Sequence, residues 1–197
     1  MIWILASAST RRADLLLQAG QRFAVEPSRV EEVVRPGESA TTFAARVARE
    51  KALEIARGRP GRWVLGADTV VIVDDAPLGK PACTEEAIVM LQRLSGRTHQ
   101  VATAFALVDP RGCVFEEEVV ISEVAFRNLE PREIEEYVES GEPCDKAGAY
   151  AIQGGAGGFV AELRGSWSNV VGLPMDEVES ALRSAGLWRS PQAGLGE

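Results

Sequence analysis

One apolar run near the middle of the chain constrains the fold more than any other feature. Residues 62–73, with the sequence RWVLGADTVVIV, are dominated by aliphatic side chains and are followed by the turn-forming pair Asp74-Asp75. This composition is typical of a buried β-strand. A single carboxylate, Asp68, interrupts the run, and burying it without a partner would cost several kcal/mol. We therefore expect Asp68 to be paired with a cation or to bind a metal ion.

Predicted strands and helices alternate along the rest of the chain. Further strands are expected at residues 1–6, 21–28, 98–108, 113–126 and 159–163. Helices are expected after a cap at Ser9 or Thr10, at residues 39–57, after a cap at Thr84, from Pro131 onward and at residues 175–185. This order, with one hairpin inserted, predicts an α/β protein with a mixed sheet. We expect a single domain over residues 1–188 and a flexible tail at 189–197.

Charge and cysteine content argue against several classes of protein. The 197 residues carry a formal net charge of -8, which repels nucleic acid, and no basic stripe with interleaved aromatic residues occurs. Three cysteines without a CxxC pair favour free thiols in a reducing cytosol. The amino end is too short for a signal peptide, and no apolar run reaches the length of a membrane span. We expect a cytoplasmic protein with no nucleic-acid or membrane partner.

The first polar cluster, LASASTRR at residues 5–12, follows a predicted strand and opens a helix. The backbone N–H groups at a helix start favour an anion. Arg11 and Arg12 would add planar donors suited to phosphate oxygens, and Ser7 and Ser9 would add hydroxyl donors. The alternative is that the hydroxyls cap the helix and the arginines lie at the surface.

Asp68 and two lysines admit more than one interpretation. A salt bridge from Asp68 to Arg62 or to a lysine would be structural. Otherwise Asp68 can take a proton from an attacking water, or bind Mg²⁺ or Mn²⁺ with Glu32 as a second carboxylate. Lys51 and Lys80 are each either a ligand contact or a surface lysine. The tight backbone of the segment LGKP makes Lys80 the better candidate of the two, although no P-loop sequence occurs.

A third polar cluster, DKAGAYAIQG, occupies residues 145–154. Its small residues allow the backbone to approach a ligand closely. The amide of Gln153 has the donors and the acceptor that complement the imide edge of uracil or thymine, and the alternative is a satisfied loop glutamine. His99 is the only histidine, and because no nucleophile motif accompanies it we expect it to be structural or at the surface.

Taken together, these segments resemble the Maf family of nucleoside triphosphate pyrophosphatases, which is named for septum formation. The resemblance spans nearly the whole chain. It rests on LASASTRR, EKA at 50–52, GADTVV at 66–71, LGKP at 78–81, MLQRLSGRTHQVAT at 90–103, GEP at 141–143, DKAGAYAIQG and GSWSNVVGLP at 165–174. One departure is Thr10, where the family usually has proline.

The resemblance implies an elongated α/β fold with a mixed sheet, two lobes and a central cleft, and commonly a homodimer. It also implies hydrolysis between the α- and β-phosphates of a nucleoside triphosphate with a divalent metal cation, Mg²⁺ or Mn²⁺. By motif, Asp68 is the proton acceptor, and Asp68 and Glu32 belong to the metal site. The residues implied to bind substrate are Ser7, Arg11, Arg12, Lys51, Thr69, Lys80 and Gln153. Among these, Arg12, Thr69 and Gln153 match the trio that marks the branch acting on dTTP and UTP.

Two other functions stay open at this point. The first is a nucleotide-binding regulator of septum formation or cell division with little turnover. The second is a pyrophosphatase of similar fold that prefers 7-methyl-GTP or a purine such as ITP. The presence of Asp68 among several cations favours an enzyme that clears pyrimidine nucleotides from the pool.

Overall fold

A computed structural model describes residues 2–190 of the chain. Within this range, seven strands form one sheet in the order β2-β1-β3-β5-β6-β7, and β4 pairs with β3 beside this path. The strands are β1 Trp3–Leu5, β2 Phe23–Val25, β3 Val64–Val73, β4 Ala76–Leu78, β5 Thr98–Val108, β6 Val114–Phe126 and β7 Val160–Arg164. Strand β1 runs parallel to β2 and β3, whereas the remaining pairs are antiparallel. The predicted mixed sheet and its inserted β5–β6 hairpin are confirmed.

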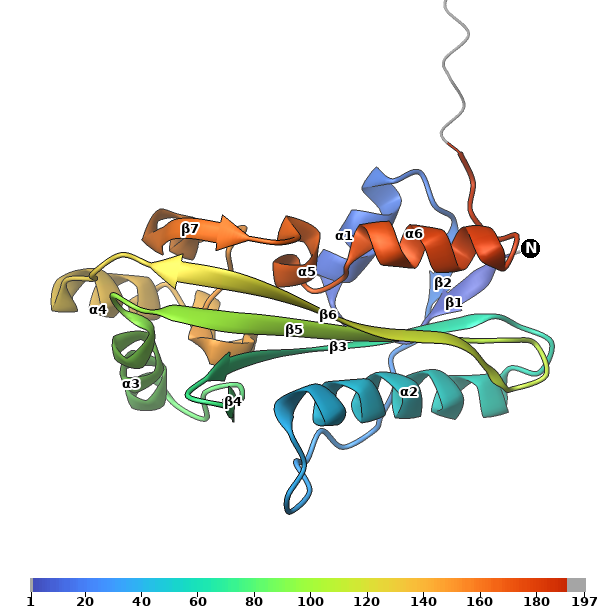
Figure 1. The fold of residues 1–197 in the computed structure, drawn as a ribbon, viewed down its shortest axis with the longest axis horizontal. Helices are drawn as coiled ribbons and strands as arrows, with labels where there is room; N and C mark the ends of the chain where they lie inside the picture. The colour runs from blue at the N-terminus through green and yellow to red at the C-terminus, as the bar shows by residue number, and fades with distance from the viewer. Residues whose placement is uncertain (1, 191–197) are drawn as a thin grey trace, which may run out of the picture.

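Helices cover both faces of this sheet (Figure 1). They are α1 Thr10–Gln18, α2 Ala40–Gly58, α3 Thr84–Leu94, α4 Pro131–Glu139, α5 Trp167–Val171 and α6 Met175–Ser184. Helix α2 lies along one face, and α1, α5 and α6 lie on the other, while α3 and α4 gather at one end (Figure 1). No helix within residues 2–190 combines the length and the apolar character needed to cross a bilayer. Most of the tail expected at 189–197 falls on residues 191–197, which are outside the described residues.

Local details differ from the sequence-based expectations at helix ends and in short segments. Thr84 is the first residue of α3 and the cap position belongs to Cys83, so the predicted cap at Thr84 was wrong. Ser9 occupies the cap position of α1 but its side chain makes no capping hydrogen bond. Helix α5 and the 3-10 helices Glu142–Asp145, Ala147–Ala149 and Gly155–Phe159 were missed, because segments this short carry no readable periodicity.

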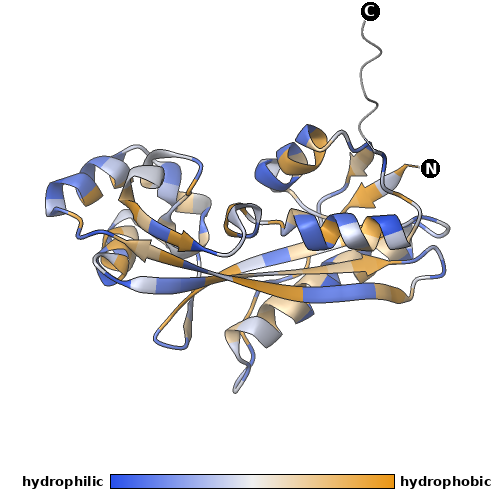
Figure 2. Cartoon of the chain, turned by 45° about the horizontal axis from the view of Figure 1, so that its top comes forward, coloured by the Kyte–Doolittle hydropathy of each residue, from blue (hydrophilic) through white to orange (hydrophobic). Residues whose placement is uncertain are grey.

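Two apolar clusters lie toward opposite ends of the long sheet, and they form the two expected lobes (Figure 2). One cluster joins β1, α1 and α6 and includes the fully buried side chains of Trp3, Leu16 and Leu182. The other joins α3, α4 and β6, with Leu91 and Ile134 among its members. Because β3, β5 and β6 run through both lobes, the sheet is a continuous support for whatever lies between them.

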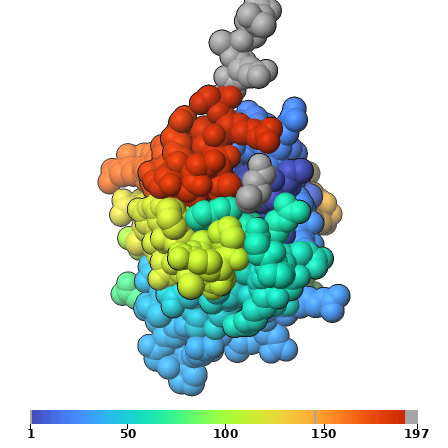
Figure 3. Space-filling view, turned by 90° about the vertical axis from the view of Figure 1, so that its right-hand side faces the viewer, coloured from blue at the N-terminus to red at the C-terminus, as the bar shows by residue number. Residues whose placement is uncertain are grey.

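The end of the first lobe is closed by two turns that lie side by side (Figure 3). The segment between α2 and β3 meets the β5–β6 turn there, and Gly61 N donates to Pro110 O at 3.1 Å. Next to this bond the rings of Trp63 and Phe115 meet edge to face, with their centroids 5.1 Å apart. These contacts fix the start of β3 relative to the hairpin.

The close contact between α2 and β3 depends on Gly66. A Cβ atom on Gly66 would lie 2.3 Å from Ala48 O, a separation that real structures do not allow. Asp68 follows two residues later and therefore points to the same face of β3, toward α2. Lys51 follows Ala48 by three residues, which places both on one face of α2. The missing side chain at Gly66 thus brings Lys51 and Asp68 together.

A break in the pairing of β3 creates the space for a cleft. Strand β1 pairs with β3 only at Val64 and Leu65, and β4 pairs with it only from Val71 to Val73. Strand β5 occupies the opposite edge throughout. The edge of β3 between β1 and β4 consequently has no strand partner over residues 66–70, and this stretch includes Asp68.

Candidate active site

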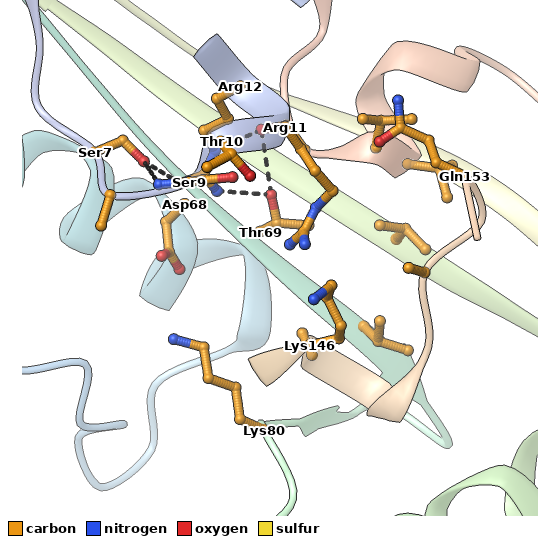
Figure 4. Close-up of a pocket in the computed structure, with 18 of the residues that line it drawn as sticks. Ser7, Ser9, Thr10, Arg11, Arg12, Asp68, Thr69, Lys80, Lys146 and Gln153 are labelled. Carbon is orange, nitrogen blue, oxygen red and sulfur yellow. Dashed lines mark hydrogen bonds between the residues drawn. The ribbon is translucent and has the colours of Figure 1, made fainter. Parts of the chain in front are cut away.

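One cavity of about 370 Å³ opens at this break, and it gathers all the predicted site residues. They come from separate parts of the chain: the β1–α1 connection, the first turn of α1, the loop before α2, α2 itself, β3, the loop after β4 and the loop before β7. The predicted residues that line the cavity are Ser7, Arg11, Arg12, Glu32, Lys51, Asp68, Thr69, Lys80 and Gln153. Figure 4 shows most of them around a common space.

Lys51 joins the two carboxylates of the site. Its Nζ atom donates to Asp68 Oδ1 at 2.7 Å and to Glu32 Oε1 at 2.6 Å. Asp68 and Lys51 are 5% and 7% exposed, so this is a buried ion pair. Of the structural partners considered for Asp68, a lysine is therefore the observed one. Arg62 instead donates to the backbone oxygen of Ile2.

The two carboxylates that share Lys51 have opposite pKa shifts. Burial raises the pKa of Asp68, and the nearby charges of Lys51 and Arg12 offset this only in part. Burial also acts on Glu32, but hydrogen bonds and charges from Lys51 and Lys80 outweigh it and lower the pKa of Glu32. Titratable neighbours whose environments push their pKa values apart are suited to different roles. Asp68 is suited to accept a proton, and Glu32 to remain ionised.

The oxygen donors at this position suit a hard divalent cation. Asp68 Oδ2 accepts no hydrogen bond from residues 2–190, although its carboxylate is buried. Glu32 lies beside it on the other side of Lys51. Mg²⁺ and Mn²⁺ are commonly bound through one or two carboxylates together with substrate oxygens. The described residues contain no group of three or more acidic, histidine or cysteine side chains for a metal, so substrate oxygens would have to complete such a site.

Arg12 holds three parts of the site together. Its Nε donates to Gly172 O at 2.7 Å, Nη1 to Ser7 Oγ at 3.1 Å and Nη2 to Thr69 Oγ1 at 3.0 Å. Thr69 Oγ1 also lies 2.9 Å from Thr103 Oγ1. Two of the three residues of the predicted specificity trio are therefore bonded to each other. Arg12 is buried, so it is not the surface arginine considered as an alternative.

Three cationic side chains point into the open part of the cavity. Arg11, Lys80 and Lys146 are directed toward one space beside Asp68 (Figure 4). Within residues 2–190 the guanidinium of Arg11 makes no hydrogen bond or ion pair, and the ammonium of Lys80 pairs with Glu32 Oε2 at 3.3 Å. Lys146 was not predicted as a site residue. It lies in the charged DKAGAYAIQG cluster, and nothing in the sequence distinguishes it from a surface lysine.

The other end of the cavity is apolar. Val71 and Val101 are cross-strand partners on β3 and β5, and both line the cavity. The loop before β7 lies directly on Val71, because a Cβ on Gly148 would come within 2.9 Å of that side chain. The same loop carries Gln153, whose amide has no protein hydrogen-bond partner among the described residues and lies away from Asp68 (Figure 4). The satisfied loop glutamine considered as an alternative is therefore not observed.

His99 is structural, as expected for a lone histidine. It is 2% exposed, its Nε2 lies 2.8 Å from the Tyr150 hydroxyl oxygen, and its ring packs edge to face on Phe126. Burial lowers the pKa of His99 to about 4. The imidazole is therefore neutral near pH 7. It supports Tyr150, which forms part of the cavity wall.

Cations and a buried carboxylate lie at one end of the cavity, and apolar side chains with a free amide lie at the other. In an α/β protein, such a cavity suits a ligand with an anionic end and a flat, polar-edged end, as a nucleotide has. The chain belongs to the Maf family, described as Maf-like protein, which matches residues 3–185. It is similar to a dTTP/UTP pyrophosphatase from Myxococcus xanthus (strain DK1622), 50% identical over 190 residues that cover 95% of each chain. A dTTP/UTP pyrophosphatase from Geobacter metallireducens is 46% identical over 183 residues, covering 93% of this chain and 95% of that one.

The chain is also similar to a solved structure. It is a nucleoside-triphosphatase, or dITP/XTP pyrophosphatase, from Mycobacterium abscessus, which covers 95% of this chain and 96% of its own. It is 16% identical, with a TM-score of 0.41.

Proposed function

We propose that this protein hydrolyses dTTP and UTP to the nucleoside monophosphate and pyrophosphate. The observation that carries this proposal is the division of one cavity into a cationic end beside Asp68 and an apolar end beside Gln153. A triphosphate needs the first and a pyrimidine base the second. The names of the two relatives, which match over nearly their whole length, support the same substrates.

In the proposed reaction, a water oxygen bonds to the α-phosphorus while the bond from that phosphorus to the α–β bridging oxygen breaks. Asp68 accepts the proton of the water, because its raised pKa suits a general base. Arg11, Lys80 and Lys146 offset the charge that develops on the departing pyrophosphate. Gln153 hydrogen-bonds the imide edge of the base, which uracil and thymine share.

We propose that Asp68 and Glu32 hold a divalent cation, Mg²⁺ or Mn²⁺, together with phosphate oxygens of the substrate. When bound, such a cation neutralises phosphate charge and makes the attacking water more acidic. The Lys51 ammonium keeps the two carboxylates close together in the protein described here. This pre-arrangement lowers the cost of assembling the site when the metal and nucleotide arrive.

Domain organisation, location, ligand class and oligomeric state can be proposed as well. We propose that residues 1–188 act as one domain, because one sheet supports both sides of the cavity. Three exposed free cysteines support a reducing, cytoplasmic location. The net charge of -8 supports a small anionic ligand in place of nucleic acid. A homodimer follows from the family resemblance and is tested by sedimentation at several concentrations.

One experiment tests the function. Pyrophosphate release is measured on UTP, dTTP, CTP, GTP, ITP and 7-methyl-GTP, with Mg²⁺, with Mn²⁺ and with excess chelator. We expect UTP and dTTP to react fastest, with one monophosphate formed per pyrophosphate and no reaction in chelator. Tight binding without pyrophosphate release would favour a nucleotide-binding regulator. Faster reaction of ITP or 7-methyl-GTP would assign the protein to a purine-directed enzyme.

A further inference from the structure

The loop that carries Gln153 is held in place by hydrogen bonds to two side chains, Tyr137 and Glu142, which do not line the cavity. Tyr137 is near the end of α4, and Glu142 follows in the GEP segment. The Tyr137 hydroxyl accepts a hydrogen bond from Ala151 N at 3.1 Å. Glu142 Oε2 accepts one from Gly155 N at 3.1 Å. These two amides lie two residues before and two residues after Gln153, so the loop is fixed on both sides of it.

The two holding groups are themselves joined. The Tyr137 hydroxyl donates to Glu142 Oε1 at 3.0 Å, which gives one connected chain from Ala151 N to Gly155 N. Tyr137 is 7% exposed, and burial raises the pKa of its phenol, so the hydroxyl stays protonated and can donate. Hydrogen bonds to a carboxylate are stronger than neutral ones. Glu142 is therefore an effective anchor for the loop.

The glycines of the loop fit closely against this pair. A Cβ on Gly154 would lie 2.0 Å from Glu142 Oε1, and a Cβ on Gly155 would lie 3.1 Å from the Tyr137 ring. The loop thus presents backbone without side chains toward Tyr137 and Glu142. Its opposite side presents Gln153 to the cavity (Figure 4). The hydrogen bonds that hold the loop consequently also determine where the Gln153 amide lies.

We propose that Tyr137 and Glu142 are positioning residues for base selection, which they control by fixing the Ala151–Gly155 loop and with it the Gln153 amide. This inference rests on the proposed function, in which Gln153 contacts the base. Neither residue lines the cavity, so neither touches the substrate. Substituting either residue should therefore change the discrimination between bases and leave hydrolysis at Asp68 unchanged.

The test combines kinetics with amide exchange in the full chain. Tyr137→Phe and Glu142→Ala should each lower the ratio of kcat/KM for UTP to that for CTP by about tenfold, through KM for UTP, with kcat nearly unchanged. Exchange of the Ala151 and Gly155 amides, followed by NMR, should accelerate in the same variants. Glu142→Gln keeps the shape of the side chain and one acceptor oxygen, so its base ratio and amide exchange should be intermediate between those of Glu142→Ala and the wild type. Glu139→Ala, an exposed change at the end of α4, is the matched control and should resemble the wild type.

A double variant separates positioning from a general structural role. If Glu142 acts through Gln153, then Glu142→Ala combined with Gln153→Ala should change the base ratio no more than Gln153→Ala alone. Additive losses would overturn the proposal, as would accelerated exchange with an unchanged base ratio. Unchanged exchange of both amides would overturn it as well. A wild-type enzyme without base preference would instead refute the proposed function, and amide exchange alone would then decide whether these residues hold the loop.

Discussion

The Lys51 ammonium lies 2.7 Å from Asp68 Oδ1, where α2 packs on the face of β3 between the residues that pair with β1 and those that pair with β4. A buried charge pair of this kind contributes little net stability, because desolvation of both ions offsets their attraction. The pair instead positions the two carboxylates, because the same ammonium also binds Glu32. The pair therefore couples the packing of the sheet to the arrangement of the candidate catalytic carboxylates.

Replacing Asp68 by asparagine should abolish most turnover without unfolding the protein. The amide oxygen of the new side chain could still accept a hydrogen bond from Lys51, but it could not accept a proton. We expect turnover of UTP to fall on the order of 10²–10⁴-fold, as for the loss of a general base. The measurement is single-turnover pyrophosphate release, with circular dichroism to monitor folding. Asp74→Asn, an exposed carboxylate just beyond β3, is the control. Near-normal turnover of the Asp68 variant would remove Asp68 from the mechanism.

Removing Lys51 should destabilise the fold through the charge left behind. In Lys51→Met, Asp68 would remain buried without its cation, at a cost of about 3 kcal/mol. Urea denaturation gives this change in the free energy of unfolding. Adding Asp68→Asn should recover part of the loss, because no unpaired carboxylate then remains. Arg49→Met on the same helix, where the ion pair with Glu117 is exposed, should cost about 1 kcal/mol or less. Equal losses in the two methionine variants would contradict this account.

Alanine substitutions at Gln153 and at Arg12, which with Thr69 form the predicted specificity trio, should have different effects on base preference and stability. Gln153→Ala should weaken the preference for UTP and dTTP over CTP and leave the metal requirement unchanged, because only the base contact is lost. Arg12→Ala should change the base ranking and also lower stability, since Ser7, Thr69 and the Gly172 carbonyl lose their shared donor. Substrate panels and thermal unfolding measure both effects. Gln92→Ala, exposed on α3, is the neutral control. A base ranking that survives both changes would refute the assignment of the trio.

The acid limb of the activity profile should follow the ionisation of Asp68. Protonated Asp68 cannot act as a base, so kcat/KM should rise with pH through the pKa of Asp68 and then level off. Because burial raises the pKa of Asp68 above its ordinary value of 3.8, the midpoint should also lie above 3.8. Glu32 stays ionised across this range because its pKa is lowered. A midpoint at or below the ordinary value would contradict the assignment.

His99 should make the stability of the protein depend on pH. Its pKa is about 4 in the folded protein and 6.5 when unperturbed, so the unfolded chain binds the proton more tightly. The contribution to stability is fully present above pH 6.5 and is lost as the pH falls toward 4. We expect a loss on the order of 3 kcal/mol over this interval. Urea denaturation at several pH values measures it, and His99→Gln should flatten the dependence. An NMR titration of His99 in the folded protein with a midpoint near its unperturbed pKa would contradict the prediction.

Short-range pattern was enough to predict the main elements of the fold. The valine-rich run of β3, the paired strands around the Asp109–Gly112 turn and the apolar stripe of α2 each appear in the structure close to the predicted bounds. These features depend on the periodicity of neighbouring residues, which is visible in a linear sequence. Short helices such as α5 were missed because their position depends on packing against distant residues.

The sequence by itself also determined which chemical groups are available: a carboxylate in an apolar strand, arginines at a helix start and an amide in a small-residue loop. Only the tertiary structure decided which of these groups contact one another. It paired Asp68 with Lys51, bonded Arg12 to Thr69, added Lys146 to the cavity and placed Tyr137 and Glu142 behind Gln153. Such pairings depend on which segments meet across the sheet, and residues that meet in this way can be separated by a large part of the chain.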